Sequence, residues 1–357
     1  MANNNNTKNL NVPNLRFPEF TGEWKETIFE KICNIATGNK NTQDKKEDGE
    51  YPFYVRSEMV ERINSYSFNG EAILTAGDGV GVGKVFHYVN GKVGVHQRVY
   101  ILSNFECSCK FAYYYFSSKF YNRVKRMSAK NSVDSVRHDM IAQMPILLPA
   151  RHEQNKIAQF LCLLEQRIET QIKIIEDLKK LKSSLLDLLF QNNSKWSTYC
   201  ISEILTIGNG RDYKHLKEGN IPVYGTGGYM LSVNDYLYEG ESVCIGRKGT
   251  IDMPMFLTGK FWTVDTLFYT HNFRNILPKF CYYLFTMINW QRYNEASGVP
   301  SLSKATIEKI KVSVPSINEQ VYICSILDSV NNKIDVERSI LNEFKKQKQH
   351  LLQQMFV

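Results

Sequence analysis

The 357-residue chain lacks the short patterns that most often mark an enzyme. It has no Pro-Pro pair, which the Asn/Asp-Pro-Pro-aromatic loop of an amino-group methyltransferase requires. A glycine-rich segment, residues 77–84, has Asp78 where a Walker A loop needs its first glycine, and Val85 in place of the Ser or Thr after the lysine. It is instead typical of a tight β-loop. No Ser/His/Asp set or matched pair of carboxylates is found. We therefore expect no catalytic site and no cofactor.

Cysteine spacing also excludes the common metal sites. The 8 cysteines are scattered, the closest pair is Cys107 and Cys109, and no C-x-x-C occurs. Cys162 and Cys324 fall within helical patterns, where a free cysteine usually acts as a small core residue. We expect no metal, and reduced thiols in a cytoplasmic protein.

Long apolar runs are missing as well. No stretch approaches the roughly 20 apolar residues of a membrane span, and the first residues have no apolar core of a signal peptide. Residues 1–14 are polar, and we expect a disordered tail there. No membrane contact is predicted.

What is present is typical of a globular protein with more than one domain. The chain is 43% hydrophobic and 22% charged, and its length exceeds that of one ordinary domain. The net charge of +8 favours a polyanionic partner without identifying one.

An internal repeat organises the chain. Residues 141–190 match residues 307–356 without gaps, so that Pro149 aligns with Pro315 and Phe190 with Phe356. Glu-Gln at 153–154 recurs at 319–320 in the same register. Heptads alone do not produce such matches, and looser echoes extend upstream. The sequence therefore predicts two copies of one unit, each a globular part followed by a long helix.

Both repeated segments have the 3.5-residue apolar period of a coiled coil. The predicted helices cover residues 150–192 and 315–357, each roughly 60 Å long. Glu337 and Lys348 interrupt the second seam. The two helices are expected to pair with each other in antiparallel fashion. The predicted seams are Ile157, Leu161, Leu164, Ile168, Ile172, Ile175, Leu178, Leu181 and Leu185, and Ile323, Leu327, Val330, Ile334, Leu341, Phe344, Leu351 and Met355.

The globular parts, residues 15–149 and 193–314, have mixed patterns. Short β-rich runs at 72–75, 82–89 and 93–102 are broken by glycines, and 221–271 repeats this character. Tyrosine-rich helices follow at about 110–127 and 278–295. We predict an α+β fold: two similar domains with strongly bent sheets, joined by two long antiparallel helices with pseudo-two-fold duplication.

Basic and hydrogen-bonding residues gather in the predicted loops of both copies. Arg and Gln read guanine and adenine edges, whereas Lys and Thr commonly bind phosphates. For any single residue a solvated basic face is the favoured alternative, but equivalent positions in both copies weaken it for the set. Tyr113, Tyr114, Tyr115, Tyr282 and Tyr283 could stack on bases, although helical core is favoured. The candidate DNA-binding residues are Arg56, Lys84, His96, Gln97 and Arg98, and Tyr224, Thr226, Arg247, Lys248 and Thr250, with His87 and Asp265 nearby.

Several segments in this order resemble the specificity subunits of type I restriction–modification systems over nearly the whole chain. The spacer-helix starts Pro-x3-Glu-Gln-x2-Ile lie at 149–157 and 315–323. Residues 73–79, 244–250 and 261–266 resemble segments of the family's target-recognition domains. The duplicated order is the specific part of the resemblance.

The resemblance implies a division of labour. Each globular domain would read one half of a split double-stranded DNA site, and the helices would set the gap and dock two modification subunits. Those subunits bind S-adenosylmethionine and methylate adenine, and separate restriction (motor) subunits use ATP and cleave. Glu337, Lys348 and Tyr322, which stands where the first copy has Lys156, depart from the pattern and affect the details of docking. The alternatives are a complete nuclease or methyltransferase with duplicated lobes, and an adaptor that does not bind DNA.

Overall fold

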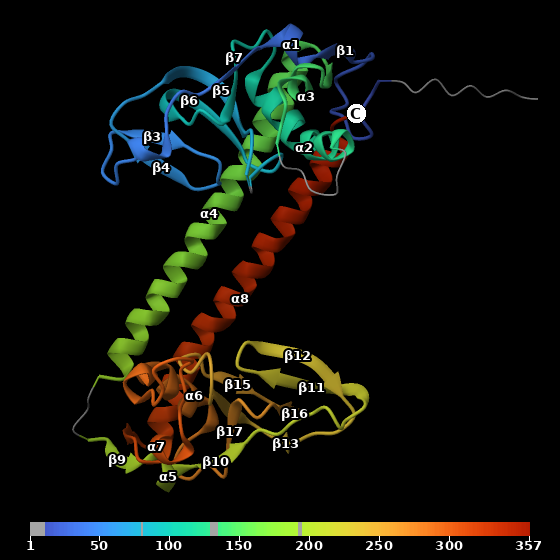
Figure 1. Cartoon of the computed structure of the whole chain (residues 1–357). Coiled ribbons are helices and arrows are strands. Elements are labelled where there is room, and N and C mark those ends of the chain that lie inside the picture. Colours follow the sequence, from blue (N-terminus) through green and yellow to red (C-terminus); the bar gives the residue numbers. More distant parts are fainter. Residues whose placement is uncertain (1–10, 80, 129–134, 192–194) are drawn as a thin grey trace, which may run out of the picture. The chain divides into compact units, whose positions relative to one another are not determined.

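The computed structural model describes residues 11–79, 81–128, 135–191 and 195–357. The chain divides into two compact units, which we call the first unit (residues 1–172 with 340–357) and the second unit (residues 173–339). Helices α4 (Arg151–Leu189) and α8 (Ile317–Gln354) each contribute to both units (Figure 1). The predicted α+β fold of two similar domains joined by two long helices is confirmed.

The first unit is built on a six-stranded sheet in the order β2-β7-β5-β6-β3-β4, in which only β3 and β6 are parallel. Its strands are β2 (Asn34–Thr37), β3 (Tyr51–Tyr54), β4 (Val60–Ile63), β5 (Phe68–Ala76), β6 (Phe86–Val95) and β7 (Val99–Ser103). The unit also contains the pair β1 (Lys25–Ile28) and β8 (Pro145–Leu148), helices α1 (Phe29–Ile32), α2 (Cys109–Met127) and α3 (His138–Ala142), and the 3-10 turn η1 (Thr42–Asp44).

This sheet is strongly curled, as predicted. Strands β6 and β7 both run antiparallel to β5, yet only three residues join them. Ten residues of β6 span about 33 Å, whereas the short connection reaches at most about 14 Å. Only a bent β6 can therefore return the chain to the end of β5 where β7 begins.

Two sequence-based boundaries in this region were wrong. The predicted run 82–89 becomes a strand only at Phe86, because residues 81–84 form a turn in which Gly83 has φ +66°. The predicted run 93–102 is two strands, separated by a turn in which the Val99 amide donates to the His96 carbonyl. Of the predicted tail 1–14, residues 1–10 lie outside the described residues. Asn11 accepts a bond from the Trp24 amide, and Pro13 is buried.

The second unit repeats the plan with two four-stranded sheets, β10-β17-β14-β15 and β12-β11-β16-β13, and the pair β18–β9. Helix α6 ends at Met287, short of the predicted 295, because Ile288 turns extended before the 3-10 turn η2 (Trp290–Tyr293). The strands are β9 (Ser197–Cys200), β10 (Thr206–Asn209), β11 (Glu218–Gly225), β12 (Gly228–Val233), β13 (Tyr238–Glu239), β14 (Ser242–Gly246), β15 (Met255–Leu257), β16 (Lys260–Thr263), β17 (Leu267–His271) and β18 (Lys311–Val314). The helices are α5 (Ile201–Ile204), α6 (Pro278–Met287) and α7 (Lys304–Glu308).

The repeated Glu-Gln pair attaches each long helix to its globular part. In the first unit, buried Gln154 accepts from the Ser108 amide at 2.8 Å and donates to the Pro149 carbonyl at 2.8 Å. In the second unit, Gln320 accepts from the Leu277 amide at 2.7 Å and donates to the Pro315 carbonyl at 3.0 Å. Ser108 and Leu277 are the N-cap residues of α2 and α6. One glutamine therefore joins the starts of two helices in each unit.

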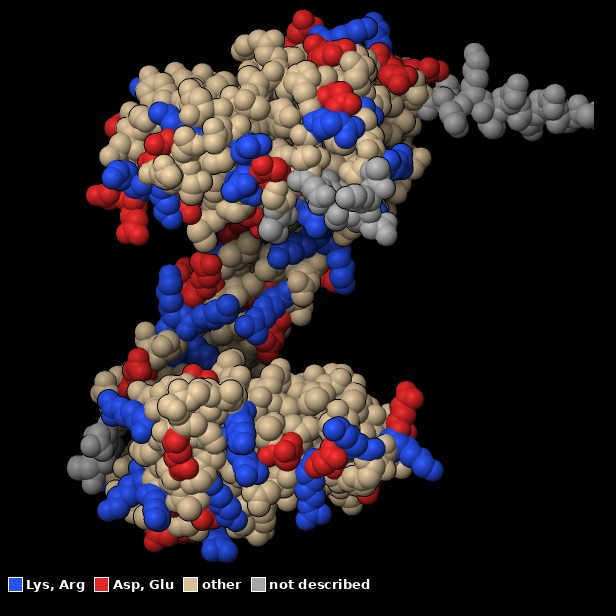
Figure 2. Space-filling model, viewed as in Figure 1, with Lys and Arg blue, Asp and Glu red and all other residues tan. Residues whose placement is uncertain are grey.

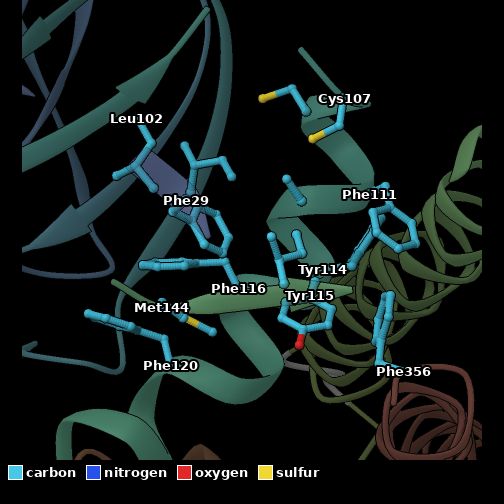
Figure 3. Packing of buried hydrophobic residues seen from close by; sticks show 14 of the residues in the cluster. Phe29, Leu102, Cys107, Phe111, Tyr114, Tyr115, Phe116, Phe120, Met144 and Phe356 are labelled. Carbon is cyan, nitrogen blue, oxygen red and sulfur yellow. The ribbon is translucent and has the colours of Figure 1, made fainter. Parts of the chain in front are cut away.

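The repeated phenylalanine closes the other end of each helix. Phe356 lies 5.4 Å from Phe111 and 5.6 Å from Tyr115, ring centroid to ring centroid (Figure 3). In the second unit, Phe190 stacks on Phe280 at 5.1 Å. Tyr114, Tyr115 and Tyr283 are buried, as favoured for the tyrosine-rich helices, and Tyr113 and Tyr282 are half-buried.

The helices pair in antiparallel fashion within each unit. In the first, Lys348 near the end of α8 donates to Glu165 of α4 at 2.5 Å, and Arg167 lies over the Phe344 ring at 5.1 Å. In the second, the last turns of α4 pack on the same cluster as Ile323 and Leu327, near the start of α8. The early half of each helix thus meets the late half of the other.

The seam of α4 differs from the prediction at two positions. Ile172 and Leu181 are 37% and 47% exposed, whereas Gln171 is 7% exposed and Lys182 is half-buried. Alternating steps of three and four residues from Ile168 reach positions 171 and 182. The geometry of the coil therefore turns these positions toward the partner helix, although the residues beside them are apolar. The same register places Glu337 and Lys348 inside the α8 seam, where they form ion pairs with Lys333 and Glu165. Among the described residues, no helix is long and apolar enough to cross a membrane.

Replacing Gln154 by Leu is expected to lower the free energy of unfolding of the first unit by about 1–3 kcal/mol, because a buried amide and carbonyl lose their partner. Hydrogen-exchange mass spectrometry resolves the two units, and faster exchange at α2 with an unchanged α6 is expected. Exposed Gln159→Ala is the control and should change little. Equal exchange in Gln154→Leu and wild type would contradict the anchoring role.

Candidate nucleic-acid interface

The structure brings together four of the predicted site residues of the first unit. Arg56 follows β3, and Gln97 and Arg98 lie in the turn after β6 with His96. Strands β3 and β6 are parallel neighbours, so their carboxyl ends meet at one edge of the sheet. With Asn41, Thr42 and Gln43 these residues line a recess of about 360 Å³.

Asp78 joins the two arginines of this recess. Its carboxylate accepts from Arg56 Nη1 at 3.0 Å and lies 3.6 Å from Arg98 Nη1. Both guanidinium side chains stay accessible, 47% and 65% exposed, and Asp78 is 26% exposed. The glycine loop brings Asp78 into place: a Cβ on Gly81 would lie 2.2 Å from the Arg56 carbonyl oxygen, so only glycine allows this approach. This supports the tight β-loop that the sequence predicted; Val80 lies outside the described residues.

His96 supports the turn from inside. It is 5% exposed, its Nδ1 accepts from the Arg98 amide at 3.0 Å, and its Nε2 lies 3.3 Å from the Thr42 hydroxyl. Burial lowers the pKa of His96; the charges of Arg56 and Arg98 lower it further, and Asp78 opposes them. The neutral ring therefore fixes the Arg98 backbone.

Lys84 lies outside the recess lining, with its ammonium 5.3 Å from the Tyr121 ring centroid on α2. The His87 ring lies tilted against the Tyr54 ring, with 4.9 Å between the ring centroids.

The predicted residues of the second unit also converge. Tyr224 is the second-last residue of β11, Thr226 lies in the turn to β12, and residues 247–250 follow β14. A Cβ on Gly249 would lie 3.5 Å from the Thr226 hydroxyl oxygen, so these loops touch. The Arg247 guanidinium reaches the Asp265 carbonyl at 3.5 Å, and the Thr250 carbonyl packs against Gly246.

Backbone bonds align the two sites residue by residue. The Gly77 amide donates to the Arg98 carbonyl, and the Arg247 amide donates to the Thr266 carbonyl. The backbone of Asp78 forms an isolated antiparallel β-bridge with Ser135, and that of Lys248 forms one with Ser301. Gly79 and Gly249 both have positive φ. The amides of His96 and Val264 donate to the carbonyls of Tyr54 and Tyr224. Asp78 therefore corresponds to Lys248, Arg98 to Thr266 and Arg56 to Thr226.

Sequence reasoning did not identify Asp78, Thr266 or residues 41–43 as parts of these sites. Asp78 and Thr266 lie in segments already singled out, and pairing the glycines at 79 and 249 would have aligned Asp78 with Lys248. Residues 41–43 lie in a polar stretch without a signal. Charge alone does not mark the sites either: on the face shown in Figure 2, Lys and Arg are interspersed with Asp and Glu.

The cysteines are unpaired, and most of them are buried. All 8 cysteines are free thiols, and burial raises the pKa of Cys33 and Cys244 to about 12, so these stay protonated. The described residues contain no group of three His, Cys, Asp or Glu side chains that could hold a metal ion.

Comparison with known proteins matches this duplication. The family model for the type I restriction modification DNA specificity domain matches residues 21–180 and again residues 193–346. The chain therefore belongs to the type I restriction–modification DNA specificity family. Members of this family are the specificity subunits of these systems, and they are not catalytic themselves.

Curated relatives and solved structures agree. The EcoDI specificity subunit of Escherichia coli is 26% identical over 148 residues, 42% of this chain and 32% of that protein. The matched regions of the first two curated relatives cover only about a third of their length. The MjaVIII specificity subunit of Methanocaldococcus jannaschii is 22% identical across 95% of this chain and 92% of its own. The fold is similar to that of a type I S subunit from M. genitalium, with TM-score 0.68, 19% identity and coverage of 97% and 99%.

Lowering the pH should selectively remove the contribution of His96 to stability. Its pKa in the folded chain lies below the unfolded value of about 6.5, so this contribution is complete above that pH and is lost as the pH falls through the folded pKa. The difference in Tm between wild type and His96→Asn is therefore expected to shrink from pH 8 to pH 5, measured by differential scanning calorimetry. A constant difference would show that the ring does not act through its neutral form.

Proposed function

We propose that this chain is a DNA-reading subunit that recognises a bipartite double-stranded target, with one half read by each unit. The observation that carries this proposal is the matched loop site of each unit. Arg56, Asp78 and Arg98 meet in the first, and Thr226, Lys248 and Thr266 occupy the aligned positions in the second. Arginine and lysine accessible at equivalent sheet edges suit duplex DNA, where phosphates position a protein and base edges specify sequence. All ten predicted site residues remain candidates for this contact.

We further propose that the paired helices dock two modification subunits, which supply S-adenosylmethionine-dependent adenine methylation, and that restriction subunits join where the system has them. Exposed apolar side chains on the helices support docking. In the first unit Phe160 and Leu163 are 38% and 55% exposed, and they line a groove of about 640 Å³ between α4 and the late part of α8. In the second unit Val321 and Tyr322 are 54% and 63% exposed. Contiguous exposed apolar surface is typical of a protein interface.

A solved structure that concerns complex assembly and conformational transition of the type I R-M system has a similar fold, with TM-score 0.59 and 12% identity over 92% of this chain and 96% of its own. At 12% identity, this likeness shows a shared fold alone. A cytoplasmic location stays a prediction for this chain.

Binding assays separate this function from its two alternatives. The full chain with a modification subunit should shift duplex DNA at 150 mM salt, and the affinity should fall steeply with salt. The purified chain alone should neither methylate nor cut DNA. Turnover by the isolated chain would support a complete enzyme, and a complex that does not bind DNA would support an adaptor.

Lengthening both helices together should widen the gap between the two half-sites. One heptad inserted after Ile168 and one after Ile334 preserves both seams and adds about 10.5 Å. At about 3.4 Å per base pair, the gap should grow by roughly 3 base pairs, or less where DNA twist or bending absorbs part of the change. Mapping methylated adenines after reaction with the modification subunit measures the gap.

The control is an insertion of two residues after Ile168 alone, which breaks the heptad register and should abolish assembly. An unchanged gap in the active heptad variant would mean that the helices do not set the spacing.

A further inference from the structure

We propose that the first unit reads a G·C base pair through Arg56 and Arg98, with Asp78 holding the two guanidinium groups together and oriented. This inference rests on the proposed DNA-reading function and assigns its chemistry in one half-site. The second unit has different side chains at the aligned positions, so the two half-sites should differ in sequence.

The guanidinium groups retain the donors that guanine needs. An arginine carries five N–H donors, and guanine presents the acceptors O6 and N7 side by side in the major groove. Asp78 engages Nη1 of each arginine, at 3.0 Å for Arg56 and 3.6 Å for Arg98. Exposed ion pairs of this kind contribute little to stability. Their effect here is to restrict the rotamers of two accessible side chains and so lower the entropy lost on binding.

The carboxylate favours a base edge over a phosphate as the target. A phosphate held by both arginines would lie beside the Asp78 carboxylate, and like charges at that distance repel. A base pair avoids this conflict, because guanine accepts from arginine and the N4 amino group of its cytosine can donate to a carboxylate. Asp78 is 26% exposed and can accept such a bond.

The backbone under both arginines is fixed. The amide of Arg98 is bonded to His96 and its carbonyl to the Gly77 amide, while the neighbouring Gln97 amide donates to Lys40 at 2.9 Å. The Arg56 carbonyl packs on Gly81. Direct readout needs this kind of preorganisation, because a loose side chain reaches many phosphates but no single base.

The aligned positions of the second unit provide a comparison for the arginine pair of the first unit. Thr226, Lys248 and Thr266 replace Arg56, Asp78 and Arg98, so the paired guanidinium arrangement is absent from these aligned positions of the described chain. Thr226 and Thr266 lack the planar fork that binds guanine with two bonds, and Lys248 is a single point charge. Substitutions at these positions should therefore change a different half-site.

The test selects bound sequences from randomised duplex DNA with the full chain assembled with its modification subunit. Wild type is expected to select a bipartite sequence with G·C at a fixed position of one half. Arg98→Lys and Arg98→Ala should both reduce that preference by roughly 5- to 150-fold, because lysine keeps the charge but loses the fork. Asp78→Asn should weaken the G·C preference while non-specific binding stays equal or becomes tighter. Thr266→Ala is the matched control and should leave this half unchanged.

Each outcome bears on a different claim. Selection of no bipartite sequence by wild type would remove the proposed function itself. A bipartite sequence that changes with Arg98→Ala but contains no G·C there would overturn this inference alone. So would an Arg98→Lys variant that selects like wild type, combined with an even loss of affinity for all sequences in Arg98→Ala, because that pattern identifies a phosphate contact.

Discussion

The hydrogen bonds of one buried glutamine in each unit are the constraint on which the rest of the structure depends. Gln154 and Gln320 each connect the first turn of a long helix to the N-cap of the tyrosine-rich helix in the same unit. Beside them, buried Glu153 accepts two bonds from Arg16, and Glu319 accepts one from the Trp196 indole. These bonds set the direction in which the long helix leaves the globular part. The loops that carry the arginines belong to the sheet on which the tyrosine-rich helix packs, so their placement follows from the same bonds.

In both units, a tyrosine hydroxyl of the tyrosine-rich helix donates to a carboxylate of a long helix. Glu165 accepts from both Lys348 and the Tyr114 hydroxyl, at 2.5 and 2.7 Å. In the second unit, the Tyr283 hydroxyl donates to Asp328 at 2.5 Å and accepts from Asn331 at 2.6 Å. An apolar seam tolerates several registers, whereas a polar group in the seam is satisfied in few of them. In the first unit, the Lys348–Glu165 pair therefore favours one register of α4 against α8, at the cost of some apolar burial.

The sequence allowed the architecture to be predicted because the repeat and the heptads are local patterns with a fixed period. Both long helices followed from them, whereas the bent sheets were predicted from β-rich runs broken by glycines. The errors lie where geometry overrides local character, as at Ile172 and Leu181, where the coil buries Gln171 and half-buries Lys182 instead. The two arginines could be singled out by residue type, but their shared partner Asp78 could not, because the three come from separate strands that only the curled sheet brings together.

The order in which the chain leaves the ribosome has a consequence for its folding. The second unit is continuous, residues 173–339, whereas the first unit needs residues 340–357 in addition to the first 172. Phe356 lies in the same core as Phe111, so that core closes around a residue made long after the rest of it. Contacts between residues so distant in sequence are slow to form, because the entropy of closing a long loop must be overcome first. Until synthesis passes the end of α8, the nascent first unit exposes part of its aromatic core, and during that interval it is open to aggregation and to chaperones.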